Sequence, residues 1–212
     1  MVKKIKKNIK RAIDEDKFNF IIDKLKSDVY DDKVLFNLLL LNTLLYYTGS
    51  RISEILLMNK NNIEELLKSK SFNSFCKKTQ DYRTLYITTQ IINKILNIFN
   101  LKNINQLIKK IDVKGLINSV NKKLDLRTST RYMERFFHLL QSNYGGGYDN
   151  LKGCCFGFHS YRVNFINQVI TKFNIDKANV MIGHKNINTT LIYFRKLKLS
   201  NEEGCNIIDN IF

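Results

Sequence analysis

Hydrophobic positions recur at helical spacing near the start of the chain. The first such stripe consists of Phe18, Ile21, Ile22 and Leu25. Residues 32–47 are apolar on nearly every side, which favours a helix at the centre of the core. Asp31 and Asp32 offer a cap and a favourable charge for its first turn, and Gly49 is placed to end it. The pattern predicts two consecutive helices, the second of them buried.

Between residues 59 and 90 the pattern becomes alternating, because Leu85 and Ile87 alternate with Thr84 and Tyr86. We expect two strands, over 72–78 and 82–88, around the polar turn KKTQD. Helical stripes follow at 90–99, 113–120, 133–140 and 159–173. The pattern therefore predicts an α+β chain that is mainly helical and has one small antiparallel sheet.

The net charge of the chain indicates what kind of partner it binds, which the hydrophobic pattern does not. The chain of 212 residues has 35 Lys and Arg against 19 Asp and Glu, a net charge of +16. Such an excess favours a polyanionic partner, although an AT-rich coding sequence also enriches lysine. The four cysteines form no C-x-x-C pair, which indicates a reducing, intracellular location. The longest apolar run, 34–47, is too short for a membrane span of about 20 residues, so we expect no membrane partner.

Three short segments carry candidate chemistry: TGSRISEILLM at 48–58, HSYR at 159–162 and GHKNINTTLIY at 183–193. Arg51 follows a predicted helix end, where a rigid turn would hold its guanidinium as a fork for phosphate oxygens. A solvated surface arginine is the alternative. His159 and Arg162 fall in the first turn of a predicted helix, whose positive end also attracts phosphate.

Taken together, these segments resemble the catalytic domain of the tyrosine recombinases, the lambda-integrase and Xer-like enzymes that cut and rejoin DNA through a phosphotyrosine. The family's first box, TG-x-R-x-SE-x-x-x-L, is matched by Thr48, Gly49, Arg51, Ser53, Glu54 and Leu57. Its H-x-x-R box is matched by His159 and Arg162, and its GH box by Gly183 and His184, with Tyr193 nine residues after the histidine. The resemblance spans about residues 30–195. It departs at Tyr161 and Val163, where the family prefers Leu and His.

The resemblance implies roles for these residues. Arg51 and Arg162 would neutralise the charge that grows on a phosphate as it becomes five-coordinate, and His184 would add a donor to the same oxygens. Tyr193 would be the nucleophile, with His159 as the base, because the pKa of a tyrosine is ordinarily about 10. No cluster of carboxylates indicates a two-metal site, so we expect neither a metal nor another cofactor.

The family also delivers a lysine from its hairpin to protonate the leaving 5′ oxygen. Lys78 lies five residues before Arg83, which matches the family's K-x-x-x-x-R step. Lys77 is the alternative, since a lysine in a turn is often only solvated. Glu54 is expected to support the start of its helix and to orient basic partners.

The resemblance implies a domain plan as well. We expect a basic arm or linker at 1–16, the catalytic domain at 17–198, and a tail at 199–212 that docks on a neighbouring protomer or packs back on its own subunit. The family's N-terminal DNA-clamping domain does not fit into the roughly 30 residues before the match. The expected partners are double-stranded DNA and three further copies, as a tetramer on DNA, with a monomer in isolation.

The sequence thus predicts a site-specific DNA recombinase or integrase, of the kind that viruses and mobile elements carry. It would work through a 3′-phosphotyrosine intermediate in the cytoplasm or, for a virus, in the host cytoplasm or nucleus, without metal or ATP. Two alternatives stay open: a type IB topoisomerase-like enzyme, and a DNA-binding protein that kept the fold and lost the reaction.

Overall fold

The computed structural model describes residues 11–144, 156–184 and 186–194. The chain divides into two compact units, residues 1–165 and residues 166–212. The boundary falls inside helix α8, His159–Lys172. Within the described residues, no helix combines the length and the apolar character that a membrane span requires.

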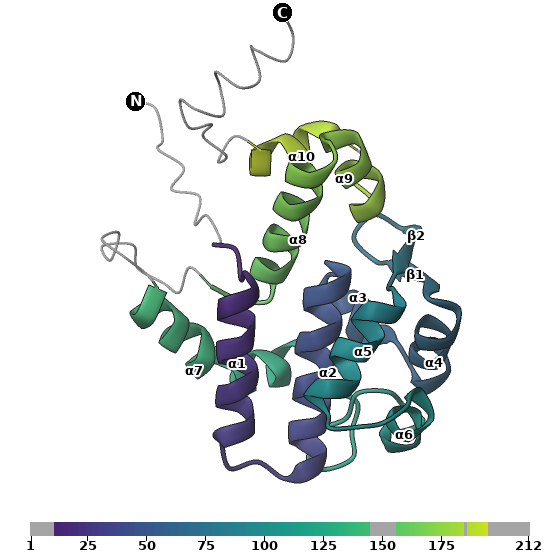
Figure 1. Cartoon of the computed structure of the whole chain (residues 1–212), viewed down its shortest axis with the longest axis vertical. Helices are drawn as coiled ribbons and strands as arrows, with labels where there is room; N and C mark the ends of the chain where they lie inside the picture. The colour runs from purple at the N-terminus through teal and green to yellow at the C-terminus, as the bar shows by residue number, and fades with distance from the viewer. Residues whose placement is uncertain (1–10, 145–155, 185, 195–212) are drawn as a thin grey trace, which may run out of the picture. The chain divides into compact units, whose positions relative to one another are not determined.

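The first unit is mainly helical (Figure 1). Before the hairpin its helices are α1 Glu15–Ser27, α2 Asp32–Thr48, α3 Ile52–Leu57 and α4 Lys60–Ser69. The hairpin consists of β1 Ser71–Cys76 and β2 Asp81–Tyr86. After it come α5 Thr89–Ile98, α6 Ile104–Lys110 and α7 Leu126–Tyr144. The second unit contains the later part of α8 with α9 Ile175–Ile182 and α10 Ile187–Phe194. The prediction of a mainly helical α+β fold with a small antiparallel sheet is confirmed.

Helix α2 is the centre of the first unit, as its all-round apolar pattern predicts. Asp31 caps it by accepting from the N–H groups of Lys33 and Val34. Gly49 ends it in the left-handed conformation at φ 59°. A Cβ atom at Gly49 would lie 2.4 Å from a ring carbon of Phe165, so both the backbone angle and the space require glycine there. Helices α1 and α5 pack against α2.

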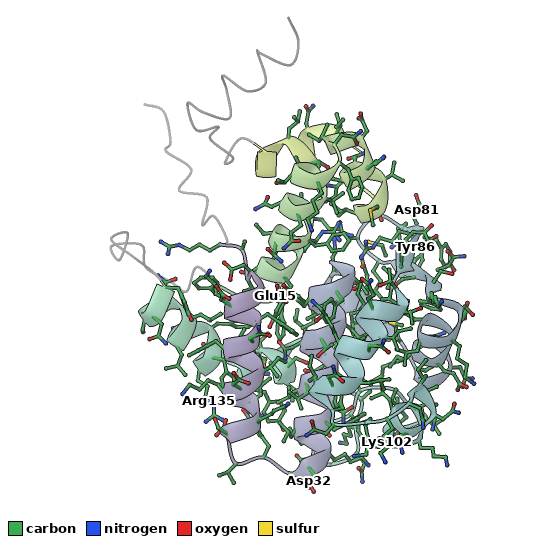
Figure 2. All side chains as sticks on the ribbon, in the orientation of Figure 1. Glu15, Asp32, Asp81, Tyr86, Lys102 and Arg135 are labelled. Atoms are coloured by element: carbon green, nitrogen blue, oxygen red, sulfur yellow. The ribbon has the colours of Figure 1, made fainter. Side chains whose placement is uncertain are left out.

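The hairpin is shorter than predicted. Cys76 pairs with Asp81 as the last pair of the register, and residues 77–80 form the turn (Figure 2 labels Asp81 and Tyr86 at the two ends of β2). Lys77 and Lys78 therefore lie in the turn and not at a strand end. Along β2 the side chains alternate: Arg83 and Leu85 are buried, while Tyr82 and Tyr86 are exposed.

Two predictions about elements are wrong. Residues 113–120 are not a helix but a folded loop with isolated bridges, in which Val113 and Val120 are exposed. The side chain of Asn118 accepts from the N–H groups of Val120 and Lys122, a local bond that competes with a helix. The second is the expected change of pattern from residue 59 onward, because residues 60–69 form the helix α4 instead.

Candidate active site

Arg51 stands at the start of α3, immediately after the turn at Gly49 and Ser50 that follows α2. Its backbone N–H donates to Oε2 of Glu54 at 3.1 Å, and its Nη1 donates to Oε1 at 2.9 Å. The same Nη1 lies 2.9 Å from Sγ of Cys76 at the end of β1. The guanidinium is thus held from both α3 and the hairpin, while 18% of the side chain stays exposed.

Glu54 is the buried carboxylate of this site, with 1% of its surface exposed. Nε and Nη2 of Arg83 donate to its Oε2 at 3.0 and 2.8 Å. Burial works to raise the pKa of Glu54, but the guanidinium groups of Arg83 and Arg162 and the hydrogen bonds from Arg51 and Arg83 hold the pKa below its ordinary value. Glu54 is therefore ionised at neutral pH, and its predicted role in orienting basic partners is confirmed.

Arg83 connects the hairpin to the turn that carries Arg51. Besides its bonds to Glu54, its Nη2 donates to Oγ of Ser50 at 3.0 Å, and Ser50 is hydrogen-bonded to Thr48 at 2.6 Å. The sequence patterns indicated Arg83 only through its spacing from Lys78, and they indicated no role for Cys76. The alternation of β2 places Arg83 on the buried face with Leu85. Because a buried arginine is nearly always paired, this alternation could have indicated that Arg83 has an acidic partner.

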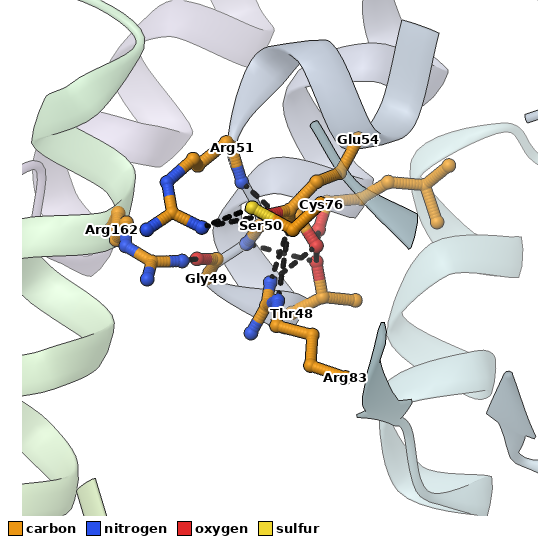
Figure 3. Close-up of polar contacts among 9 residues, drawn as sticks. Thr48, Gly49, Ser50, Arg51, Glu54, Cys76, Arg83 and Arg162 are labelled. Carbon is orange, nitrogen blue, oxygen red and sulfur yellow. Dashed lines mark hydrogen bonds and ion pairs between the residues drawn. The ribbon is translucent and has the colours of Figure 1, made fainter. Parts of the chain in front are cut away.

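Arg162 reaches the same turn from α8. Its Nη1 donates to the carbonyl oxygen of Gly49 at 3.0 Å, and 1% of its surface is exposed. Figure 3 shows the guanidinium groups of Arg51, Arg83 and Arg162 gathered around the turn at Gly49 and Ser50. Three guanidinium groups around one carboxylate leave an excess of positive charge, which suits an anion with two negatively charged oxygens.

His159 is the first residue of α8 and is exposed. The turn before it is closed by Ser160, whose N–H donates to the carbonyl oxygen of Gly157 at 2.8 Å and whose Oγ accepts from the Gly157 N–H at 3.1 Å. His159 and Arg162 therefore share the first turn of α8, as predicted.

Tyr161 stands between His159 and Arg162 and is completely buried. Its hydroxyl donates to Oδ1 of Asn42 in α2 at 2.5 Å. Nδ2 of Asn42 in turn donates to the carbonyl oxygen of Leu38 at 2.7 Å. The first turn of α8 is consequently fixed to α2 through both Tyr161 and Arg162.

The two lysines of the hairpin turn are both exposed. The carbonyl oxygen of Lys77 accepts from Nε2 of Gln80 at 2.8 Å, which helps to close the turn. Within the described part of the chain, no contact distinguishes the side chain of Lys78 from that of Lys77, so the choice of Lys78 stays a prediction.

The second unit contains His184 and Tyr193. Nδ1 of His184 lies 2.9 Å from Oγ1 of Thr190. Tyr193 belongs to α10, and its side chain lies outside the described residues. Among the residues that the structure describes, no three His, Cys, Asp or Glu side chains are grouped so as to hold a metal ion.

A sequence profile of the phage integrase family matches residues 11–199. The chain belongs to the phage integrase family. The members of this family that cut and rejoin DNA do so as tyrosine recombinases, and the resemblance deduced from the three sequence boxes is confirmed at the level of the family. A comparison with curated protein sequences finds no match.

Solved structures of several recombinases and integrases share the fold. XerA recombinase is 17% identical over 99% of this chain and 66% of its own, with a TM-score of 0.60. The Tn1549 transposon integrase in complex with circular intermediate DNA is 12% identical over 99% of this chain and 69% of its own, with a TM-score of 0.63. The catalytic domain of bacteriophage HP1 integrase is 16% identical over 88% of both chains, with a TM-score of 0.53. This chain thus spans about two thirds of the first two proteins and most of an isolated catalytic domain.

Proposed function

We propose that this phage integrase family member is a site-specific DNA recombinase that breaks and rejoins strands through a phosphotyrosine at Tyr193. The observation that carries the proposal is the cluster of Arg51, Arg83 and Arg162 around the buried carboxylate of Glu54. A phosphodiester is the anion that such a cluster suits, and DNA is the substrate with which the family works.

Arg51 and Arg162 would bind the scissile phosphate. Arg51 is already partly exposed, and Glu54 and Cys76 restrict the orientation of its guanidinium. Arg162 is almost completely buried, so we expect a local rearrangement to expose its guanidinium when it contacts phosphate. Because both groups stay protonated throughout, they stabilise the growing negative charge of the transition state without a metal ion.

Four further residues would carry the proton transfers and the covalent step. Tyr193 attacks the phosphorus and forms a 3′-phosphotyrosine, while His159 accepts the phenolic proton. Lys78 donates a proton to the 5′ oxygen as its bond to phosphorus breaks. His184 donates a hydrogen bond to a non-bridging oxygen. The phosphotyrosine bond keeps the energy of the broken linkage, so a 5′ hydroxyl of another strand can attack it without ATP.

We further propose that the protein assembles as a tetramer on double-stranded DNA. Exchange between two duplexes needs four strand cuts, and each chain offers one Tyr193. The Tn1549 integrase was crystallised in complex with DNA. The net charge of +16 is compatible with a DNA-bound assembly.

Strand exchange tests the proposal. The protein is incubated with a supercoiled plasmid and labelled linear duplexes that carry a library of sequences, and the junctions are sequenced. If the protein recombines DNA, new junctions should form at a recurrent sequence, and none should form with the Tyr193→Phe variant. Relaxation without junctions would favour the topoisomerase-like alternative. DNA binding with neither product would indicate a domain that has lost the reaction.

A further inference from the structure

Three side chains of the second unit, those of His184, Thr190 and Asn179, are joined in series by hydrogen bonds. Nδ1 of His184 lies 2.9 Å from Oγ1 of Thr190, and Oγ1 of Thr190 donates to Oδ1 of Asn179 at 2.9 Å. Thr190 is completely buried. The backbone supports the same arrangement, because Gly183 ends α9 in the left-handed conformation and the N–H of His184 donates to the carbonyl oxygen of Asn179 at 3.2 Å.

Counting protons shows which group donates and which accepts in each of these two hydrogen bonds. A threonine hydroxyl has one proton, and here that proton goes to the carbonyl oxygen of the Asn179 side chain. With the Asn179 side chain in this orientation, Oγ1 of Thr190 accepts from the imidazole, so Nδ1 of His184 is the nitrogen that bears hydrogen. We infer that Thr190, oriented by Asn179, is a positioning residue that holds the neutral ring of His184 in its Nδ1–H tautomer.

The tautomer determines what His184 can do to a phosphate. In the neutral Nδ1–H form, Nε2 has a lone pair and cannot donate to a phosphate oxygen. Donation from Nε2 requires the doubly protonated ring, in which Nδ1–H still points at Thr190. A nearby phosphate favours that charged form. This step rests on the proposed function: on DNA, His184 acts as an imidazolium, with a full charge as well as a hydrogen bond.

Thr190 also belongs to the helix that carries the nucleophile. It precedes Tyr193 by three residues in α10, and α10 packs against α9, which provides Asn179. The same hydroxyl that sets the tautomer of His184 therefore fixes α10 to the turn that carries His184.

Nitrogen NMR of the whole chain without DNA tests the tautomer directly. The sequence has 3 histidines, so a His184→Gln spectrum identifies the signals of this ring. At a pH where the ring is neutral, we expect the Nδ1–H pattern in the wild type and in Thr190→Ser, which keeps a hydroxyl. Thr190→Val has the same shape but no acceptor, so the ring should leave that tautomer.

A second variant should reverse the direction of the hydrogen bond between Thr190 and His184 without changing either residue. In Asn179→Leu the hydroxyl proton of Thr190 loses its acceptor and can turn to Nδ1, which favours the Nε2–H tautomer. A wild-type ring in the Nε2–H form, or a tautomer that does not change in both Thr190→Val and Asn179→Leu, would overturn the inference.

Cleavage measured in a single turnover tests the consequence. Thr190→Val should form the covalent adduct roughly 10- to 100-fold more slowly, the usual cost of a lost hydrogen bond to a charged group, with unchanged DNA affinity; Thr190→Ser should stay close to the wild type. Equal rates for Thr190→Val and the wild type would refute the positioning role. A wild type that forms no adduct would refute the proposed function instead, and the NMR result would still decide the tautomer.

Discussion

At the scale of single residues, Glu54 allows positive side chains to gather in one place. Guanidinium groups repel one another, and the buried carboxylate between them offsets that repulsion. The bonds from Arg83 fix Glu54, and Glu54 in turn fixes Arg51. A buried pair of this kind is weak evidence for net stability, but removing one partner leaves an uncompensated charge that costs about 3–5 kcal/mol.

The lowered pKa of Glu54 predicts how stability depends on pH. Its ordinary value is 4.5, and the folded value lies below it. The contribution of Glu54 is therefore complete above about pH 4.5 and is lost as the pH falls through the folded pKa. Urea unfolding over this acidic range should show a shallower loss of unfolding free energy in Glu54→Gln than in the wild type. Parallel losses in the two proteins would contradict the assignment.

The two lysines of the turn can be separated by substrate chemistry. If Lys78 protonates the leaving oxygen, Lys78→Ala should slow cleavage by roughly 10²–10⁴-fold, and Lys77→Ala, the matched control, should only weaken binding slightly. A 5′ bridging sulfur leaves without a proton, so this substrate should restore cleavage by Lys78→Ala. Failure of the rescue, or a rescue confined to Lys77→Ala, would move the role away from Lys78.

At the scale of elements, the site depends on how α8 is fixed to α2. Tyr161 replaces the leucine that the family prefers, and its hydroxyl bonds to Asn42 in the middle of α2. Arg162 bonds to Gly49 at the end of the same helix. Since Arg51 follows Gly49 by two residues in the same turn, α2 is the common reference for both arginines that we propose to bind phosphate.

A double-mutant cycle tests this link between α2 and α8. Tyr161→Phe leaves Oδ1 of Asn42 buried without that donor, which should lower the unfolding free energy by about 1–3 kcal/mol. Adding Asn42→Leu removes the stranded acceptor, so the double variant should be more stable than the sum of the single effects predicts. Thr43→Val, which loses only a bond within α2, is the control. Additive losses in urea unfolding would show that the two side chains are not coupled.

Elements with strong periodicity could be predicted from the sequence, and weakly patterned ones could not. The all-round apolar α2, its Asp31 cap and its Gly49 end follow from local preferences. Residues 113–120 show the limit: their apolar spacing fits a helix, yet the Asn118 side chain and Gly115 at φ 90° favour a loop. Such competition between local bonds and the hydrophobic pattern is decided by packing.

At the scale of the whole molecule, the sequence boxes indicate candidate residues for the chemistry, but not the contacts that hold those residues in place. Arg51 and Arg162 are 111 positions apart in the sequence. The family boxes indicate that both belong to one site, and the structure places both at the turn that contains Gly49. The contacts of Arg51 with Cys76, and of Arg83 with Glu54, join segments whose pairing depends on the register of the hairpin. The alternation along β2 indicates which side chains are buried, but not which residue of β1 each of them faces.

The net charge predicts how the whole chain binds DNA. With a net charge of +16, the 212 residues should bind DNA mainly through phosphate contacts, weakly and largely without sequence preference. Affinity should therefore fall steeply as salt rises, because each contact releases a counterion. Fluorescence anisotropy across a salt series measures the slope. Sequence-selective binding that barely responds to salt would contradict this expectation.

The proposed reaction requires that Tyr193 becomes covalently attached to DNA. The wild type is incubated with labelled duplexes nicked next to each candidate site, denatured in SDS and digested, and the peptide that carries nucleotide is sequenced by mass spectrometry. We expect a 3′-linked nucleotide on Tyr193 and no adduct in Tyr193→Phe, which should bind DNA with unchanged affinity. An SDS-resistant adduct in Tyr193→Phe, or a nucleotide on another of the 10 tyrosines, would contradict it.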